Sequence, residues 1–135
     1  MIQVTDGVFL SKVSVQNVEK VLPYLGESVQ LVNSGCWKVV AFASILALRA
    51  FERGTNHAKT LGGELLLRLA GTLQIKEAIK DVGVREGPNY LVVFGDESRA
   101  WGIIEKLGLE ELPFDDCSDE IAKTFFEKSA LVEVL

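Results

Sequence analysis

Histidine and cysteine, which supply many catalytic and metal sites, are scarce in this sequence: its 135 residues include one His and two Cys. Nothing in the sequence places a nucleophile beside His57, so a Ser-His-Asp or Cys-His arrangement has little support. Cys36 and Cys117 form no CxxC motif, and a zinc site needs several ligands at characteristic spacing. The sequence therefore shows no catalytic or metal-ligating arrangement, and we expect no metal or cofactor, with His57 as a surface residue near a helix start.

Motifs for binding phosphate or calcium are also absent. The sequence has no Gly-x-x-x-x-Gly-Lys-Ser/Thr loop and no Gly-x-Gly-x-x-Gly after a strand. The acidic pairs Asp115-Asp116 and Asp119-Glu120 lack the spacing of an EF-hand. We interpret them as a solvated loop and the N-terminal turn of a helix rather than as a cation site.

Long apolar runs and targeting signals are missing as well. The first ten residues show no basic stretch followed by an apolar one, so we expect no secretory signal. The longest apolar run, Val39–Leu48, is about half as long as a membrane span and is expected to be a buried helix. Without a secretion signal, two isolated cysteines suit a reducing compartment, so we expect free thiols and a cytoplasmic location.

Acidic residues outnumber basic ones: 19 Asp and Glu oppose 14 Lys and Arg, for a net charge of −5. This balance argues against a general nucleic-acid binder, because such domains are usually strongly basic. The distribution is uneven, however. Residues 1–48 have no net charge. Residues 49–85 carry 7 basic and 4 acidic groups, and residues 86–135 carry 4 basic and 12 acidic groups. Such asymmetry is compatible with separate partner-facing surfaces, but the favoured interpretation is that the charges simply follow solvated faces.

Length and pattern predict one domain over residues 1–135, because single domains of about 100–150 residues are the commonest. Short strands near both chain ends and clustered central helices favour an α+β fold, with a small, mostly antiparallel sheet packed against central helices. Strands are expected at Ile2–Val4, Val8–Leu10, Val29–Val32, Tyr90–Phe94 and Ala130–Val134. Helices are expected at 14–23, with Ser14 as N-cap, and at 37–53, 58–70, 74–82, 96–107 and 118–128.

The segment 58–70 shows the most informative helical pattern. Apolar and small residues surround most of the helix, and only Thr60, Glu64 and Arg68 form a narrow polar stripe. Glu64 and Arg68 are spaced to form an i,i+4 ion pair. Gly62 and Gly63 each cost about 1 kcal/mol relative to Ala in a helix, so we expect a neighbouring helix to approach there closely.

The stretch from Asn56 to Gly83 resembles the small regulatory subunits of the KEOPS complex, the family of the PRPK-binding protein TPRKB and its archaeal counterparts. The specific part is Glu-Leu-Leu followed by Gly-Thr-x-Gln-Ile, and the resemblance weakly includes the preceding helix and the C-terminal segment. The family often has a basic residue at the position of Leu73. The matching residues are Asn56–Lys59, Gly63–Leu67, Ala70–Ile75, Glu77–Ile79 and Gly83.

The resemblance implies a non-catalytic subunit with two partners. One is the small atypical PRPK-type kinase/ATPase of KEOPS, which such subunits bind and stimulate. The other is tRNA, held through its single-stranded 3′ CCA end, in a complex that makes threonylcarbamoyladenosine. For the kinase contact we single out Thr72, Leu73, Gln74 and Ile75. For tRNA we single out Arg49, Arg53, Lys59, Lys76 and Lys80, with Trp37 or Phe42 as a stacking face.

Other functions remain open from the sequence alone. One is a small-molecule-binding or enzymatic α+β domain whose site is assembled from Asp, Glu and Asn side chains. Another is a homo-oligomeric structural module with Leu73 and Ile75 in its interface. Two simpler interpretations of the singled-out residues also remain. Leu73 folds back into the core in one of them, and each of the basic residues is only a solvated charge in the other.

Overall fold

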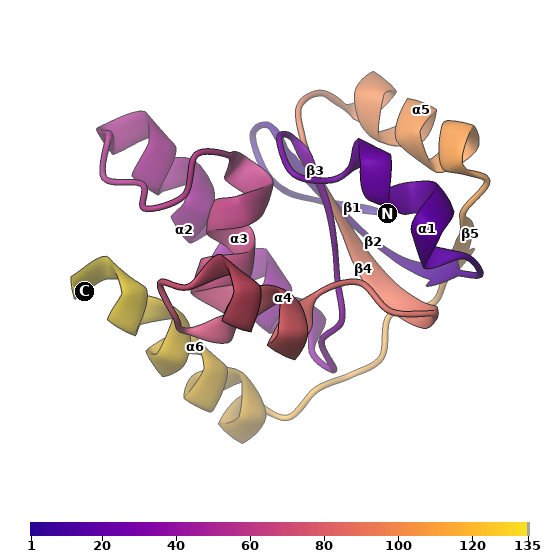
Figure 1. The fold of residues 1–135 in the computed structure, drawn as a ribbon. Helices are drawn as coiled ribbons and strands as arrows, with labels where there is room; N and C mark the ends of the chain where they lie inside the picture. Colours follow the sequence, from indigo (N-terminus) through magenta and orange to yellow (C-terminus); the bar gives the residue numbers. More distant parts are fainter. Residues whose placement is uncertain (135) are drawn as a thin grey trace.

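The structure is a computed structural model that describes the backbone of residues 1–134 and the side chains of residues 1–124, 126 and 127. It contains one five-stranded antiparallel sheet with the order β1-β2-β4-β3, and β5 pairs with the far end of β2 (Figure 1). The strands are β1 (Ile2–Thr5), β2 (Val8–Val15), β3 (Val29–Val32), β4 (Gly87–Phe94) and β5 (Glu110–Leu112).

Helices cover both faces of the sheet (Figure 1). The helices are α1 (Val18–Val21), the 3₁₀ turn η1 (Leu22–Tyr24), α2 (Trp37–Arg53), α3 (Leu61–Ala70), α4 (Ile75–Val82), α5 (Glu97–Leu107) and α6 (Asp119–Val134). α1 and α5 lie on one side, and α2, α3, α4 and α6 on the other. The predicted α+β class is confirmed. Within the described part of the chain, no helix combines the length and the apolar content that crossing a bilayer requires.

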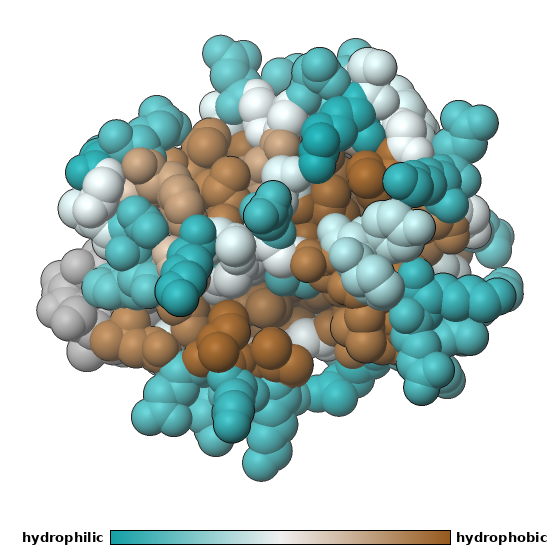
Figure 2. Space-filling view, turned by 45° about the horizontal axis from the view of Figure 1, so that its top comes forward, coloured by the Kyte–Doolittle hydropathy of each residue, from teal (hydrophilic) through white to brown (hydrophobic). Residues whose placement is uncertain are grey.

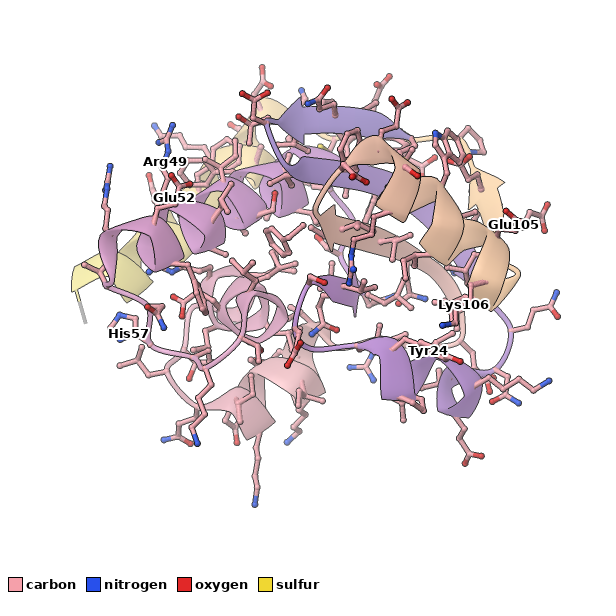
Figure 3. All side chains as sticks on the ribbon, turned by 90° about the horizontal axis from the view of Figure 1, so that it is seen from above. Tyr24, Arg49, Glu52, His57, Glu105 and Lys106 are labelled. Atoms are coloured by element: carbon pink, nitrogen blue, oxygen red, sulfur yellow. A yellow bond between two sulfur atoms is a disulfide. The ribbon has the colours of Figure 1, made fainter. Side chains whose placement is uncertain are left out.

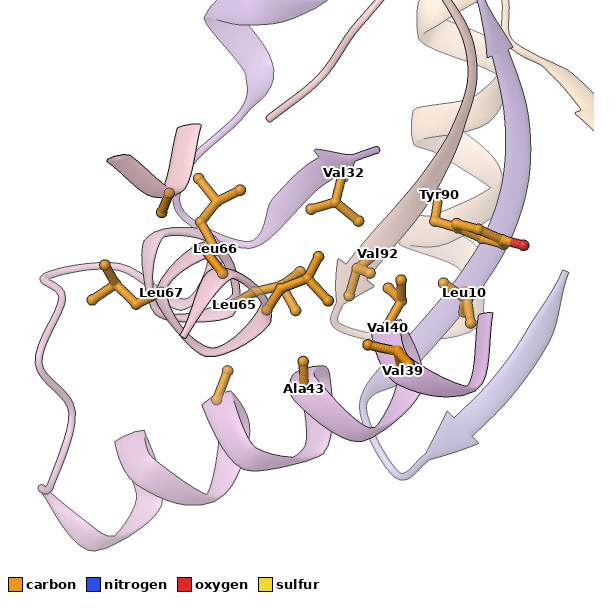
Figure 4. Close-up of a cluster of buried hydrophobic side chains, with 14 of the residues drawn as sticks. Leu10, Val32, Val39, Val40, Ala43, Leu65, Leu66, Leu67, Tyr90 and Val92 are labelled. Carbon is orange, nitrogen blue, oxygen red and sulfur yellow. The ribbon is translucent and has the colours of Figure 1, made fainter. Parts of the chain in front are cut away.

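The central strand β4 divides the core in two. Tyr90, Val92 and Phe94 face the cluster with α2 and α3, whereas Leu91 and Val93 face the cluster with α5. Side chains alternate across a strand, so a strand covered on both faces has to be apolar throughout. Figure 4 shows Val92 packed with Val40 and Leu65 of the larger cluster.

Helix caps explain why several predicted boundaries are confirmed. Gly54 ends α2 at φ 72°, and Gly108 ends α5 at φ 61°, both in the left-handed region that glycine enters without strain. Asp96 begins α5, where its carboxylate accepts a hydrogen bond from the backbone N–H of Arg99 at 2.8 Å.

Three boundary predictions are wrong. Ser14 lies inside β2, opposite Pro88 of β4 and Glu110 of β5, because strand pairing outweighs its tendency to cap a helix. The segment Ala130–Val134 belongs to α6 rather than to a strand. Short apolar runs fit either structure, and here the helix that packs on α2 and α3 simply continues. The third helix begins at Leu61, after its N-cap Thr60, rather than at Ala58.

The cysteines are not free thiols. Cys36 and Cys117 form a disulfide across 81 residues of sequence, with Cα atoms 5.3 Å apart. Residues 113–118, between β5 and α6, run past the start of α2 because Phe114 packs against both Trp37 and Tyr90. That route brings Cys117 to Cys36, which the linear sequence does not reveal.

Gly62 is explained by a loop rather than by a neighbouring helix. A Cβ on Gly62 would lie 2.3 Å from the carbonyl oxygen of Gly26, and the Gly62 N–H donates to the carbonyl of Glu27 at 3.1 Å. The loop before β3 therefore sits directly on the backbone of α3.

Candidate partner-binding surfaces

The connection between α3 and α4 holds the residues singled out for a protein partner. Gly71 ends α3 at φ 70° and donates its N–H to the carbonyl of Leu67 at 2.8 Å. The Thr72 hydroxyl then accepts a hydrogen bond from the N–H of Gln74 at 3.2 Å. This tight turn leaves Leu73 outside the core, 43% exposed.

An apolar patch continues from this turn along α4. Leu73, Ile75 and Ile79 are 43%, 42% and 53% exposed, and together they form what we call the α4 patch. Ile75 and Ile79 are one helical turn apart, whereas Ala78 is buried on the side of α4 that faces the core. Sequence reasoning missed Ile79, although its i,i+4 spacing from Ile75 on a short, otherwise polar helix was the available signal.

A groove of about 250 Å³ lies beside the α4 patch. Apolar side chains from three parts of the chain line it, together with backbone at Gly26, Gly63 and Gly83. These side chains are Leu25, Leu66, Ile75, Ile79 and Val84. Figure 2 shows apolar side chains (brown) uncovered on this side of the molecule between hydrophilic clusters (teal). The surface therefore offers both projecting and recessed apolar contacts.

The cations singled out for RNA are all exposed. Arg49 and Arg53 lie on α2, Lys59 lies in the connection to α3, and Lys76 and Lys80 lie on α4. Their charged groups make no hydrogen bond or ion pair with any described residue. α3 packs against both α2 and α4, and Figure 3 shows Arg49 beside Glu52 on the outer side of α2. The structure thus distributes these cations over three segments.

A buried carboxylate positions the segment that carries Lys59. Glu64 Oε1 accepts hydrogen bonds from the backbone N–H groups of His57 and Ala58, both at 2.8 Å. Thr60 then begins α3 by accepting from the Gly63 N–H at 3.1 Å. Lys59 therefore lies in an anchored, non-helical segment, beside a shallow hollow of about 250 Å³ that Phe51 and Leu61 also line. Figure 3 shows His57 on the same connection.

The predicted i,i+4 pair is present, and it is fully buried. Arg68 Nε donates to Glu64 Oε2 at 2.9 Å, and both side chains are 0% exposed. A buried charge is strongly destabilising unless an opposite charge and hydrogen bonds compensate it. The two backbone donors of His57 and Ala58 supply part of that compensation, so the pair couples the interior of α3 to the Lys59 segment.

The two aromatic rings considered for base stacking are engaged within the chain. Trp37 packs against Phe114 with ring centroids 5.8 Å apart, and Phe42 packs against Phe126 at 4.7 Å. Both are partly buried. Tyr24 is more exposed but lies on the opposite side of the sheet, under the Lys106 ammonium at 4.9 Å (Figure 3).

No metal centre emerges in the described part of the chain, where no three His, Cys, Asp or Glu side chains gather around one point. A hollow of about 320 Å³ is lined by polar side chains that include Lys12, Asn33, Tyr90 and Asp115. Lys12 and Asp115 form an ion pair there. Burial, and next the Asp115 carboxylate, raise the pKa of the Tyr90 hydroxyl above its usual value of 10.0, so it stays protonated.

Comparison with known proteins finds a relative that aligns with nearly the whole chain. The chain is 42% identical over 127 residues to the KEOPS complex subunit Cgi121 of Pyrococcus abyssi (strain GE5 / Orsay). The match covers 92% of this chain and 74% of that protein. No protein-family model matches. Identity of this degree over nearly the whole chain confirms the resemblance seen between Asn56 and Gly83, and the chain belongs to the TPRKB/Cgi121 family of KEOPS subunits.

Proposed function

We propose that this chain is a non-catalytic subunit of a KEOPS complex, in which it binds and stimulates the small atypical kinase/ATPase and helps to recruit tRNA through its 3′ CCA end. Its role would support threonylcarbamoyladenosine formation in tRNA, in the cytoplasm. The observation that carries the proposal is the 42% identity to a protein named as a KEOPS complex subunit.

The α4 patch is the proposed kinase contact. Leu73, Ile75 and Ile79 expose apolar surface that contributes little to this fold, and burying it against a partner would be favourable by about 25 cal/mol per Å². Specific interfaces bury about 800 Å² per partner around a few apolar anchors, so the groove beside the patch would be included. The exposure of Leu73 argues against the alternative in which it plugs the core.

Lys59 is the first cation proposed to contact tRNA. It is exposed, its ammonium has no described partner, and the backbone around it is held by Glu64 and Thr60. Arg49, Arg53, Lys76 and Lys80 are proposed as additional phosphate contacts, each of which would release counterions on binding. A short single-stranded end requires only a few such contacts, which is compatible with a net charge of −5.

Kinase binding is tested with the variants Leu73→Asp and Ile79→Asp. Each should weaken binding of a PRPK-type kinase at least 10-fold in a titration with both purified proteins, while the circular dichroism spectrum stays unchanged. Leu22→Asp is the matched control, because Leu22 is 50% exposed on the other side of the sheet. Equal affinities for all three variants and the unmodified protein would reject the α4 patch as the contact.

RNA binding is tested by gel shift with intact tRNA and with tRNA that lacks its terminal CCA. We expect binding to intact tRNA only, a large loss for Lys59→Glu, and a smaller salt dependence for that variant. Lys20→Glu on α1 is the control for charge alone. Equal binding of both RNAs would reject recognition of the 3′ end.

Self-association is the competing use of the α4 patch. Sedimentation of the isolated chain at several concentrations distinguishes the two. A dimer that Leu73→Asp dissociates, with no kinase bound in the titration above, would favour the homo-oligomeric module instead.

A further inference from the structure

Residues 113–118 form a strap that crosses the N-terminal end of α2 and leads into α6 (Figure 1). Phe114 packs against Trp37 and Tyr90, with centroids 5.8 Å apart in both cases. Asp115 pairs with Lys12, and just beyond the strap Asp119 pairs with Lys38 at 3.5 Å. The Cys36–Cys117 disulfide is the one covalent attachment.

The disulfide is the dominant attachment of the strap. The Asp115 and Asp119 side chains are 71% and 99% exposed, so water and salt screen their ion pairs and each contributes little. Phe114 is only partly buried, which leaves its aromatic contacts open to solvent on one side. Breaking the S–S bond would therefore release the strap while most of the molecule stays packed.

The two sulfurs lie in different surroundings. Cys36 is the N-cap residue of α2 and is 1% exposed, and its side chain makes no capping hydrogen bond in the disulfide form. The N-terminus of α2 favours a thiolate at that position, whereas the apolar side chains around Cys36 disfavour one. Cys117 is only partly buried, in the strap. An incoming thiolate therefore reaches Cys117 rather than the buried Cys36, and attack at Cys117 makes Cys36 the leaving group.

We propose that the Cys36–Cys117 bond is a thiol–disulfide exchange site, opened by a dithiol reductant that attacks Cys117 and expels Cys36 as the thiolate. The first thiolate of the reductant forms a mixed disulfide with the Cys117 sulfur as the S–S bond breaks. The second thiol of the reductant then displaces Cys117, so the reductant is oxidised to a disulfide and the protein gains two electrons and two protons. The reduced Cys36 takes up the capping position of α2.

Release of the strap changes the surface around the start of α2. Phe114 no longer covers Trp37 and Tyr90, and Asp115 leaves the hollow of about 320 Å³ that it lines with Lys12 and Asn33. Figure 4 shows the Tyr90 hydroxyl directed away from the apolar cluster. Tyr90 already lines that hollow and no described residue forms a hydrogen bond with its hydroxyl, so opening widens access to a polar donor beside Lys12.

The direction of exchange is tested on the native, air-oxidised protein with excess glutathione, followed by acid quenching, alkylation of free thiols and peptide mass analysis. Glutathione on Cys117 with an alkyl group on Cys36 supports the proposal. Glutathione on Cys36, two free thiols before any reductant is added, or reaction only in denaturant would each overturn it.

The release of the strap is tested by acrylamide quenching of Trp37 fluorescence in a Trp101→Phe background, because the chain has two tryptophans. Reduction by dithiothreitol should raise the quenching constant at least 2-fold while the far-UV circular dichroism stays native. The oxidised variant Asp115→Asn lacks the ion pair but keeps the disulfide, so its quenching constant should rise far less than that of the reduced protein. An unchanged constant on reduction, or an equal change in oxidised Asp115→Asn, would overturn the proposal.

Discussion

Gly62 has no Cβ, and its hydrogen side chain allows the loop before β3 to contact the backbone of α3. The carbonyl oxygen of Gly26 occupies the place where any other residue would carry its Cβ, 2.3 Å away. We predict that Gly62→Ala lowers the free energy of unfolding by about 1–3 kcal/mol, despite the higher helix propensity of Ala, because backbone has to move. Urea denaturation measures the change.

Gly102 on α5 is the matched control for that substitution. A Cβ there meets nothing within 4 Å, so Gly102→Ala should stabilise the protein by about 0.5–1 kcal/mol. If both variants shift stability in the same direction, the close approach at Gly62 is not what requires glycine.

Glu111 connects β5 to the first strands through charge. Burial alone would raise the pKa of its carboxyl, but the hydrogen bond from Ser11 and the ion pair with the Met1 ammonium, at 2.6 and 2.9 Å, hold that pKa below its ordinary value of 4.5. A lowered folded-state pKa stabilises the protein above the unfolded value, and this contribution is lost as the pH falls through the folded value.

We therefore predict that stability falls on acidification below about pH 4.5, and that Glu111→Gln makes this fall shallower. Unfolding free energies of both proteins between pH 7 and pH 3 measure the effect. Parallel pH profiles would show that Glu111 is not the group responsible.

At the scale of elements, α4 packs on α3 through one of its faces and leaves the other face uncovered. Only Ala78 of its residues is buried, while Ile79 is 53% exposed. We predict that Ile79→Ser changes the free energy of unfolding by at most about 1 kcal/mol, whereas Leu65→Ala, at 0% exposure on α3, costs about 2–5 kcal/mol. Thermal or urea unfolding compares the two, and equal losses would mean that Ile79 supports the fold rather than a partner contact.

Elements with two local signals were predictable. α2 combined a long apolar run with a terminal Gly54, and α5 combined the Asp96 cap with Gly108. The segment 130–134 had neither a cap nor a turn to separate it from the preceding helix, so its apolar residues were compatible with either structure. β5 was missed because three residues, Glu110–Leu112, form a strand only where β2 offers an edge.

At the scale of the whole molecule, the disulfide joins positions 81 residues apart. A cross-link that closes a loop of this size stabilises a protein by about 4 kcal/mol, mainly by restricting the unfolded chain. We predict that reduction lowers the melting temperature by about 10–20 °C. Calorimetry with and without reductant measures it, and Cys36→Ser should melt like the reduced protein. A melting temperature unaffected by reductant would contradict the prediction.

Charge is also organised over the whole molecule. Most acidic residues after position 85 lie on α5, β5, the strap and α6, whereas Arg49, Lys59 and Lys76 lie on or between α2 and α4. The net charge of −5 thus averages over an uneven distribution along the chain, in which acidic residues concentrate after position 85. It excludes a general nucleic-acid binder without excluding a local contact to a short strand.

The sequence by itself determined the α+β class, most helices, the Glu64–Arg68 pair and the family, because these depend on periodicity, caps and spacing within a few residues. Only the tertiary structure decided that this ion pair is buried, that Ile79 joins Leu73 and Ile75 at the surface, and that Cys117 meets Cys36. Each of those depends on segments far apart in the chain that pack together, and hydrophobic burial is non-directional, so local patterns do not encode which segments meet.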